Sequence, residues 1–285
     1  MTYLKMEYQG TYYYANLIQY ILENRFDYLM NLEGFFCDSE VIYHTRPFLK
    51  CSILHNFISF IIEAHLSEEA VNLNARDCRD YSNFDFDNPT YITPLEYVLK
   101  TYEIPHISFM EWWKENYPEE SIKNEELFTY YFEEYSGTSE WETVIEALTE
   151  DVFHILFLNR DLLQKFNNML SGYLEMCIGS DDATVIIENE DLQKYIRPNL
   201  KLYRKNIPNW VKKAVYYRDR GRCVYCNKDL TGLVSIFNKE NYDHIVPLNE
   251  YGFNDVTNIQ LLCRKCNEDK SGKQKNPAKN YERWY

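Results

Sequence analysis

Four of the eight cysteines stand as two pairs near the carboxyl end of the chain, each with the spacing Cys-x-x-Cys. One pair is Cys223 and Cys226, the other is Cys263 and Cys266, and 36 residues separate them. Thiolates are soft ligands that suit zinc, and two such pairs can close a tetrahedral four-cysteine site with no open coordination position. The spacing therefore predicts a structural zinc site in this region.

The other cysteines are scattered singly, at Cys37, Cys51, Cys78 and Cys177. Metal binding in a reducing compartment fits this distribution better than a disulfide framework does. The amino terminus lacks a basic start followed by an apolar stretch, so no secretion signal is expected. No uninterrupted apolar run reaches the roughly eighteen residues that a membrane span needs. We therefore expect a soluble, cytoplasmic protein without a membrane partner.

Between the cysteine pairs, the segment Tyr242–Leu248 begins like a β-strand and places an acid beside a histidine. These residues are Asp243 and His244, and His244 is the only histidine after residue 200. Asn258 follows, and Asn267 stands directly after the fourth cysteine. A zinc ribbon does not need this set of polar residues. The set therefore indicates a function beyond the zinc site.

The ordered motifs of residues 208–275 resemble the HNH endonucleases, in the variant whose third signature position is Asn. The motifs are the first Cys-x-x-Cys pair, the run DHIVPL, a glycine after it, and NIQLLCxxCN with a downstream Lys. The resemblance implies a ββα-metal fold. It also implies that His244 is the general base, that Asp243 and Asn267 bind a catalytic metal, and that Asn258 fixes the loop and orients the histidine.

The chemistry of these side chains agrees with the roles that the resemblance implies. Phosphodiester hydrolysis needs a base with a pKa near neutrality, which a histidine supplies without heavy tuning. A hard cation prefers oxygen ligands, so a carboxylate and an amide suit Mg²⁺ or Mn²⁺ better than softer ions. One departure is the loop Tyr251-Gly252-Phe253, where relatives often carry a glycine pair. It affects the contacts of the loop and leaves the catalytic set complete.

Charge divides the chain more clearly than the net charge of −14 suggests. Residues 1–200 hold 13 Lys and Arg against 35 Asp and Glu, whereas residues 201–285 hold 17 against 9. The basic part is attracted to phosphate backbones. We expect DNA to contact Lys212, Lys213, Arg218, Arg220, Lys270 and Lys273. For any single one of them, a solvated face is the plain alternative.

The elements that would position these residues follow from periodicity and turn chemistry. Apolar residues recur at helical spacing in Tyr14–Met30, Leu49–His65 and Trp141–Leu174. Thr93 is expected to cap a helix that starts at Pro94. The fold class is thus a mostly α N-terminal domain, residues 1–196, and a small α+β C-terminal ββα-metal (HNH) domain, residues 208–285. A linker is expected near residues 196–208, where two prolines and a change of charge occur.

The function expected from these observations is metal-dependent hydrolysis of DNA phosphodiester bonds, with structural Zn²⁺ and catalytic Mg²⁺ or Mn²⁺. Analogy alone suggests the effector of a bacterial antiviral defence system. The acidic N-terminal domain is expected to bind a protein partner or to regulate the nuclease. Two alternatives remain open, namely a catalytically inactive zinc-stabilised DNA-binding module and a nuclease that cleaves RNA.

Overall fold

The computed structural model spans 285 residues and divides into two compact units. The first unit consists of residues 1–18 and 57–153, and the second of residues 19–56 and 154–285. The residues described are 10–25, 28, 32, 34–36, 44–80, 88–176, 188, 190–231 and 241–276. Residues 196–208, where a linker is predicted, fall within the second unit. The division into an acidic domain and a nuclease domain stays a prediction.

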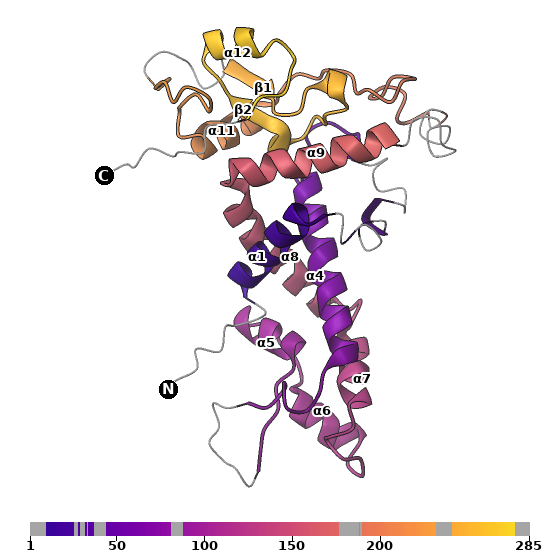
Figure 1. The fold of residues 1–285 in the computed structure, drawn as a ribbon. Coiled ribbons are helices and arrows are strands. Elements are labelled where there is room, and N and C mark those ends of the chain that lie inside the picture. Colours follow the sequence, from indigo (N-terminus) through magenta and orange to yellow (C-terminus); the bar gives the residue numbers. More distant parts are fainter. Residues whose placement is uncertain are drawn as a thin grey trace. The chain divides into compact units, whose positions relative to one another are not determined.

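The first unit is built from helices (Figure 1). Its residues come from α1 (Thr11–Glu23), α4 (Ile53–Asn72), α5 (Pro94–Thr101), α6 (Phe109–Asn116), α7 (Glu126–Tyr135) and α8 (Ser139–Phe157), and α1, α4 and α8 continue into the second unit. As predicted, Thr93 caps α5, because its side chain accepts a hydrogen bond from the backbone N–H of Glu96 at 3.1 Å. At α6, Ser108 and Glu111 form a reciprocal capping box. Local sequence thus sets where these helices begin.

Aromatic side chains form the core of the first unit. Phe109, Phe128 and Tyr131 are each 1% exposed or less. The rings of Phe109 and Phe128 lie 4.9 Å apart, between centroids, and are stacked. The Tyr131 hydroxyl donates to the backbone carbonyl of Ile107 at 2.7 Å. The polar tip of this buried ring is therefore satisfied, and the aromatic positions of this unit are packing positions.

The second unit combines helices with a small antiparallel sheet. Its elements are α9 (Arg160–Met176), α11 (Asn209–Arg218), β1 (Tyr242–His244), the one-turn helices η2 (Leu248–Glu250) and η3 (Val256–Asn258), β2 (Ile259–Leu261) and α12 (Arg264–Lys270). In the sheet, Asp243 lies opposite Gln260. The order β1, β2, α12 is the ββα arrangement that the sequence predicts (Figure 1). The prediction of a mostly helical chain with a small C-terminal α+β part is confirmed.

One predicted helical stretch, Trp141–Leu174, is interrupted. Helix α8 ends at Phe157 and α9 begins at Arg160. The reason is Asn159, whose side-chain oxygen accepts a hydrogen bond from the backbone N–H of Leu162 at 3.1 Å. An asparagine can satisfy free N–H groups at the start of a helix, so it begins a new helix inside an apolar periodic run. No helix among the described residues is long and apolar enough to cross a membrane.

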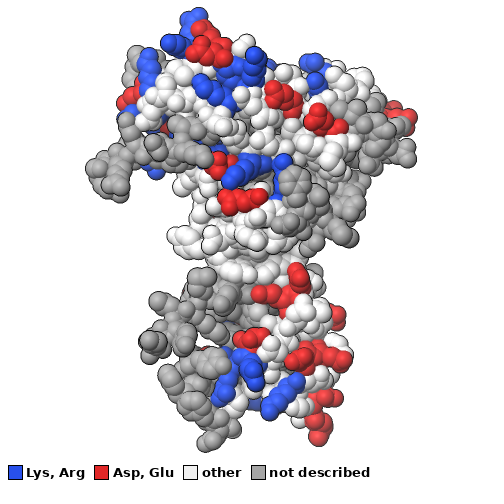
Figure 2. All heavy atoms as spheres, in the orientation of Figure 1, with Lys and Arg blue, Asp and Glu red and all other residues white. Residues whose placement is uncertain are grey.

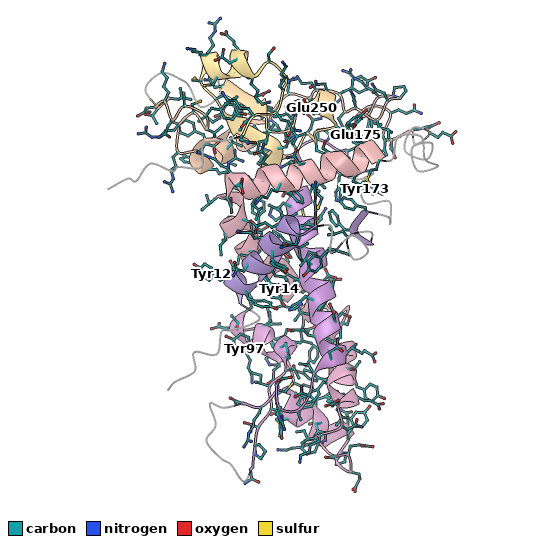
Figure 3. All side chains as sticks on the ribbon, viewed as in Figure 1. Tyr12, Tyr14, Tyr97, Tyr173, Glu175 and Glu250 are labelled. Carbon is teal, nitrogen blue, oxygen red and sulfur yellow. The ribbon has the colours of Figure 1, made fainter. Side chains whose placement is uncertain are left out.

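Helix α9 supports the sheet and the loops between its strands. The Ser171 hydroxyl donates to the backbone carbonyl of Glu250, and Glu250 lies beside α9 (Figure 3). The Asn167 side chain reaches the Thr257 hydroxyl at 3.5 Å. The carboxylate of Asp255 accepts from the backbone N–H of Ile53, at the start of α4, at 3.1 Å. Residues far apart in sequence therefore hold the ββα elements in place.

Candidate functional site

The four cysteines of the two pairs come together as predicted. The sulfur atoms of Cys223, Cys226, Cys263 and Cys266 all lie within 4.8 Å of one another. The sulfurs of Cys226 and Cys263 are 3.7 Å apart. Sulfurs that share a tetrahedral zinc ion at about 2.3 Å are about 3.8 Å apart, so this spacing fits zinc. The cluster can therefore hold a metal ion, and its donors and geometry suit Zn²⁺.

Local backbone geometry builds this cluster from both sides. Asn227 takes a left-handed conformation, with φ of 59°, and its N–H donates to the Cys223 carbonyl at 2.9 Å. Cys263 caps α12, and its sulfur accepts from the backbone N–H of Cys266 at 3.5 Å. Burial and the neighbouring thiols raise the pKa of Cys266 well above the usual range. Burial also raises the pKa of Cys226, whereas backbone N–H groups lower the pKa of Cys223, so the cluster contains a thiol that ionises readily to bind a metal.

Asp243 faces a polar pocket on the second unit. Its carboxylate accepts a hydrogen bond from the ammonium of Lys270 at 2.7 Å, and the guanidinium of Arg204 lies 3.7 Å from its other oxygen. Lys270 also donates to the backbone carbonyl of His244 at 2.8 Å. The carboxylate thus lies between two cations, and the buried ammonium of Lys270 ties α12 to β1.

Asn267 lies on the wall of the same pocket. The pocket has a volume of about 520 Å³ and is lined by Arg197, Lys201, Leu202, Arg204, Tyr242, Asp243, Pro247, Leu248, Asn249, Asn267, Glu268, Ser271 and Gly272. Asp243 reaches it from β1, and Asn267 reaches it from the first turns of α12. A carboxylate and an amide on one wall offer hard oxygen donors, so they fit a magnesium-type ion.

His244 lies apart from this wall. Along a strand, successive side chains point to opposite faces, so the imidazole turns away from the pocket that Asp243 faces. His244 is 1% exposed and does not line the pocket. Its Nε2 is 3.3 Å from the side-chain oxygen of Asn254, while its Nδ1 has no hydrogen-bond partner among the described residues. Burial, helped by the charge on Arg204, lowers the pKa of His244 to about 4. The imidazole is therefore neutral at pH 7.

Asn258 holds the loop that follows β1. Its side-chain oxygen accepts from the N–H of Val246 at 2.8 Å, and its NH2 group donates to the carbonyls of Val246 and Phe253 at 3.0 and 2.8 Å. A Cβ on Gly252 would lie 2.0 Å from the Val246 carbonyl oxygen, so only glycine fits there. Tyr251 takes a left-handed conformation, with φ of 60°.

The structure separates the basic residues predicted to contact DNA. Lys212, Arg218 and Lys270 are each 4% exposed or less, so their charged groups serve internal contacts. Lys213, Arg220 and Lys273 are exposed. Lys and Arg side chains gather at the top of the view in Figure 2, over the ββα elements labelled in Figure 1. Burial therefore speaks against DNA contact by Lys212, Arg218 and Lys270, and the prediction remains for the exposed Lys213, Arg220 and Lys273.

Arg218 belongs instead to a buried ionic cluster around Asp219, which sequence patterns did not indicate. Asp219 is fully buried and accepts from Arg218 at 2.9 and 3.0 Å, from Arg160 at 3.2 Å and from the backbone N–H of Leu261 at 3.0 Å. Arg218 also donates to the Ile259 carbonyl at 2.6 Å. In the sequence, only the adjacent pair Arg218 and Asp219, at the end of α11, points to this cluster. The third member, Arg160, lies 59 residues away from Asp219.

Comparison with known proteins agrees with this geometry. Residues 223–273 match the model of the HNH endonuclease family. The match begins at the first zinc-type cysteine, ends just after α12, and contains β1, β2 and all four cysteines. No curated protein and no solved structure matches the chain. The resemblance predicted from the motifs is confirmed for residues 223–273, and a match to this family suggests nuclease activity and nucleic-acid binding.

Proposed function

We propose that the HNH domain hydrolyses phosphodiester bonds of DNA with one divalent metal ion bound by Asp243 and Asn267. The observation that carries the proposal is that these two residues line one pocket, inside the segment that matches the HNH endonuclease family. A bound Mg²⁺ or Mn²⁺ would polarise the phosphate and stabilise the charge that develops on it. Zn²⁺ in the cysteine cluster would have a structural role.

Lys270 and Asn258 position these groups. The Lys270 ammonium holds the Asp243 carboxylate and the backbone of His244 together, which orients both ends of the Asp-His pair. The hydrogen bonds of Asn258 to the loop carbonyls fix the turn that follows the pair. Because each contact uses a buried side chain, the geometry is set before substrate arrives.

His244 is the proposed general base, although burial lowers its pKa to about 4, below the near-neutral value that the sequence predicts, so the ring needs a more exposed position to act as an effective base. Its low pKa keeps it neutral throughout the neutral range. The burial of its ring requires a movement before water or substrate can reach it. The side chain of Asn254 contacts Nε2 and also donates to the Tyr203 carbonyl at 2.9 Å. The segment that carries Tyr203 must therefore shift for His244 to act.

A second function is favoured by that same burial. With the ring of His244 enclosed, the domain has the features of a zinc-stabilised DNA-binding module without catalysis. The two functions differ in one outcome, which is whether strand breaks form when metal is present.

Incubation of the full-length protein with supercoiled plasmid, single-stranded DNA and RNA, with and without Mg²⁺ or Mn²⁺, tests the proposal. We expect nicking of plasmid only with added metal. Asp243→Asn and His244→Ala should each lower the rate by about 10²-fold or more, since a metal ligand or a general base is lost. Asp229→Asn, at an exposed carboxylate whose side chain is 56% exposed, is the matched control.

The outcomes separate the alternatives. DNA binding without breaks under any metal supports the inactive module. Breaks in RNA alone would move the substrate to RNA. Full activity of His244→Ala, with circular dichroism unchanged, would remove the general-base assignment, and full activity of Asp243→Asn would remove the metal site.

We also propose a regulatory or partner-binding role for the acidic residues 1–196, on the basis of their charge alone. A reducing, cytoplasmic location is supported by cysteines arranged as a metal cluster. A role in antiviral defence stays an analogy.

A further inference from the structure

A short turn outside the family match forms one wall of the Asp243 pocket. It consists of residues 195–205 and is called here the 195–205 turn. The N–H of Arg197 donates to the Lys201 carbonyl at 2.9 Å, and the N–H of Tyr203 donates to the Tyr195 carbonyl at 2.8 Å. These bonds fold the segment back on itself, so its two ends run side by side.

Apolar side chains and one amide fix the 195–205 turn in place. Ile196, Leu200 and Leu202 are each 3% exposed or less. The Asn254 side chain donates to the Tyr203 carbonyl at 2.9 Å, which ties the turn to the loop between β1 and β2. The turn is therefore packed against the second unit beside the pocket.

Three basic residues of the turn line the pocket, namely Arg197, Lys201 and Arg204. The guanidinium of Arg197 lies 5.1 Å from the ring centre of Tyr203, and the ammonium of Lys201 lies 4.9 Å from that of Tyr251. The Arg204 side chain is 66% exposed. Aromatic faces hold two of these cations and leave their other sides open to a ligand.

Charge balance identifies the kind of ligand. The pocket wall carries these three cations against the carboxylates of Asp243 and Glu268. Lys270 already pairs with Asp243 from the protein side. Positive charge is therefore in excess around the pocket, and a polyanion gains both Coulomb attraction and counterion release there. Arginine and lysine beside the metal-ligand pair suit phosphates adjacent to the bond that would be cut.

We propose that the 195–205 turn binds the phosphodiester backbone of DNA through Arg197, Lys201 and Arg204. The inference rests on the proposed function, because it assigns the phosphates next to the scissile bond to a segment outside the HNH match. The turn supplies affinity and register, and Asp243 and Asn267 keep their roles at the metal. Binding then draws Arg204 from Asp243 to phosphate, which frees a carboxylate oxygen.

Binding without cleavage tests the inference directly. The probe is a fluorescein-labelled 24-base-pair DNA duplex, titrated with full-length protein by anisotropy in several salt concentrations, with no added divalent metal. The double variant Arg197→Gln, Lys201→Gln should bind about tenfold or more weakly at moderate salt and should reduce the slope of log K against log salt by about 2. The matched control is Lys165→Gln, Lys228→Gln, which removes the same charge from the same unit at residues that do not line the pocket.

The result that would overturn the inference is equal loss in the two double variants, because net charge would then explain it. Unchanged or tighter binding of the Arg197→Gln, Lys201→Gln variant would also overturn it, since the turn would then cover the pocket. Plasmid nicking separates this failure from failure of the proposed function. If the protein nicks DNA but binds it equally well without the basic residues of the turn, only the inference about the turn is wrong. If the protein binds DNA through the turn but never nicks it, only the nuclease assignment is wrong.

Discussion

The cysteine cluster and the Asp219 cluster hold the same small sheet by opposite means. The cysteine cluster joins the turn after α11 to the start of α12 through four sulfurs, whose spacing suits a shared metal ion. The Asp219 cluster joins α9, α11 and β2 through a carboxylate that two arginines and a backbone N–H satisfy. The first therefore depends on an ion from solution, and the second is complete within the chain.

This difference has a consequence for how the HNH domain can be isolated. A fragment that begins near residue 201 retains all four cysteines but loses Arg160 and the whole of α9. The remaining Asp219 would keep Arg218 but would lose its second buried arginine. Deletion of residues 1–200 would thus disturb the support of the sheet as well as any regulation. Substitutions in the full chain are the cleaner test.

The largest effect should come from breaking the cysteine cluster. Cys266→Ser should abolish equimolar zinc binding and lower the melting temperature of the second unit by on the order of 10 °C or more, since structural zinc contributes about 10 kcal/mol or more in small domains. Metal analysis of the purified protein and calorimetry measure these changes. Cys51→Ser, at an exposed cysteine outside the cluster, is the control. An unchanged zinc content in Cys266→Ser would refute the four-cysteine site.

A smaller loss should follow from breaking the Asp219 cluster. Asp219→Ala leaves Arg160 and Arg218 buried without their anion and should cost about 3–5 kcal/mol in the free energy of unfolding. Chemical denaturation in saturating zinc measures it, and zinc content should stay equimolar. Asp229→Ala, on the surface, should be near neutral. If the Asp219→Ala protein lost zinc and stability together, the two clusters would be one cooperative element.

The two clusters also mark what the sequence can predict. Spacing fixed the cysteine cluster, because each Cys-x-x-Cys turn is local and two such turns need only meet once. The Asp219 cluster could not be predicted, because Arg160 is 59 residues away and its partner depends on how α9 packs. Nor could the sequence show that α11 buries Lys212 and Arg218 but exposes Lys213.

The proposed catalytic residues could be predicted from the sequence only in part. The motif predicted that Asp243 and Asn267 share a site, and both line one pocket. It could not predict that His244 is enclosed, because Asn254, which contacts both the imidazole and the Tyr203 carbonyl, comes beside it only in the folded chain. Nor could it predict that Lys270 pairs with Asp243, since a lysine four residues after a cysteine pair has many solvent-exposed alternatives. Local chemistry is readable from sequence, whereas the access to it depends on tertiary packing.

Lowering the pH should produce the smallest of the three losses of stability. The part that comes from protonation of His44 can be measured separately from the part that comes from zinc release. Burial lowers the pKa of His44, which is stacked on Phe35, from 6.5 to about 4. The unfolded chain therefore binds a proton more readily between pH 6.5 and 4, so stability falls as the pH decreases through that range. Between pH 7 and pH 5 the His44 share is about 2 kcal/mol. Protons also compete with zinc for the thiolates, which lowers stability further. Excess zinc restores the stability lost through zinc release, but not the stability lost through protonation of His44.

The variant His44→Leu sharpens this distinction. It removes the titrating group and replaces an imidazole whose Nε2 has no hydrogen-bond partner among the described residues. Measured by urea denaturation in saturating zinc, its stability should decline less steeply from pH 7 to pH 5 than that of the unsubstituted protein. A remaining slope is expected from His244, whose pKa is also lowered to about 4. Parallel slopes for the two proteins would mean that folding does not change the pKa of His44, and that acid acts on this unit only through the thiolates and His244.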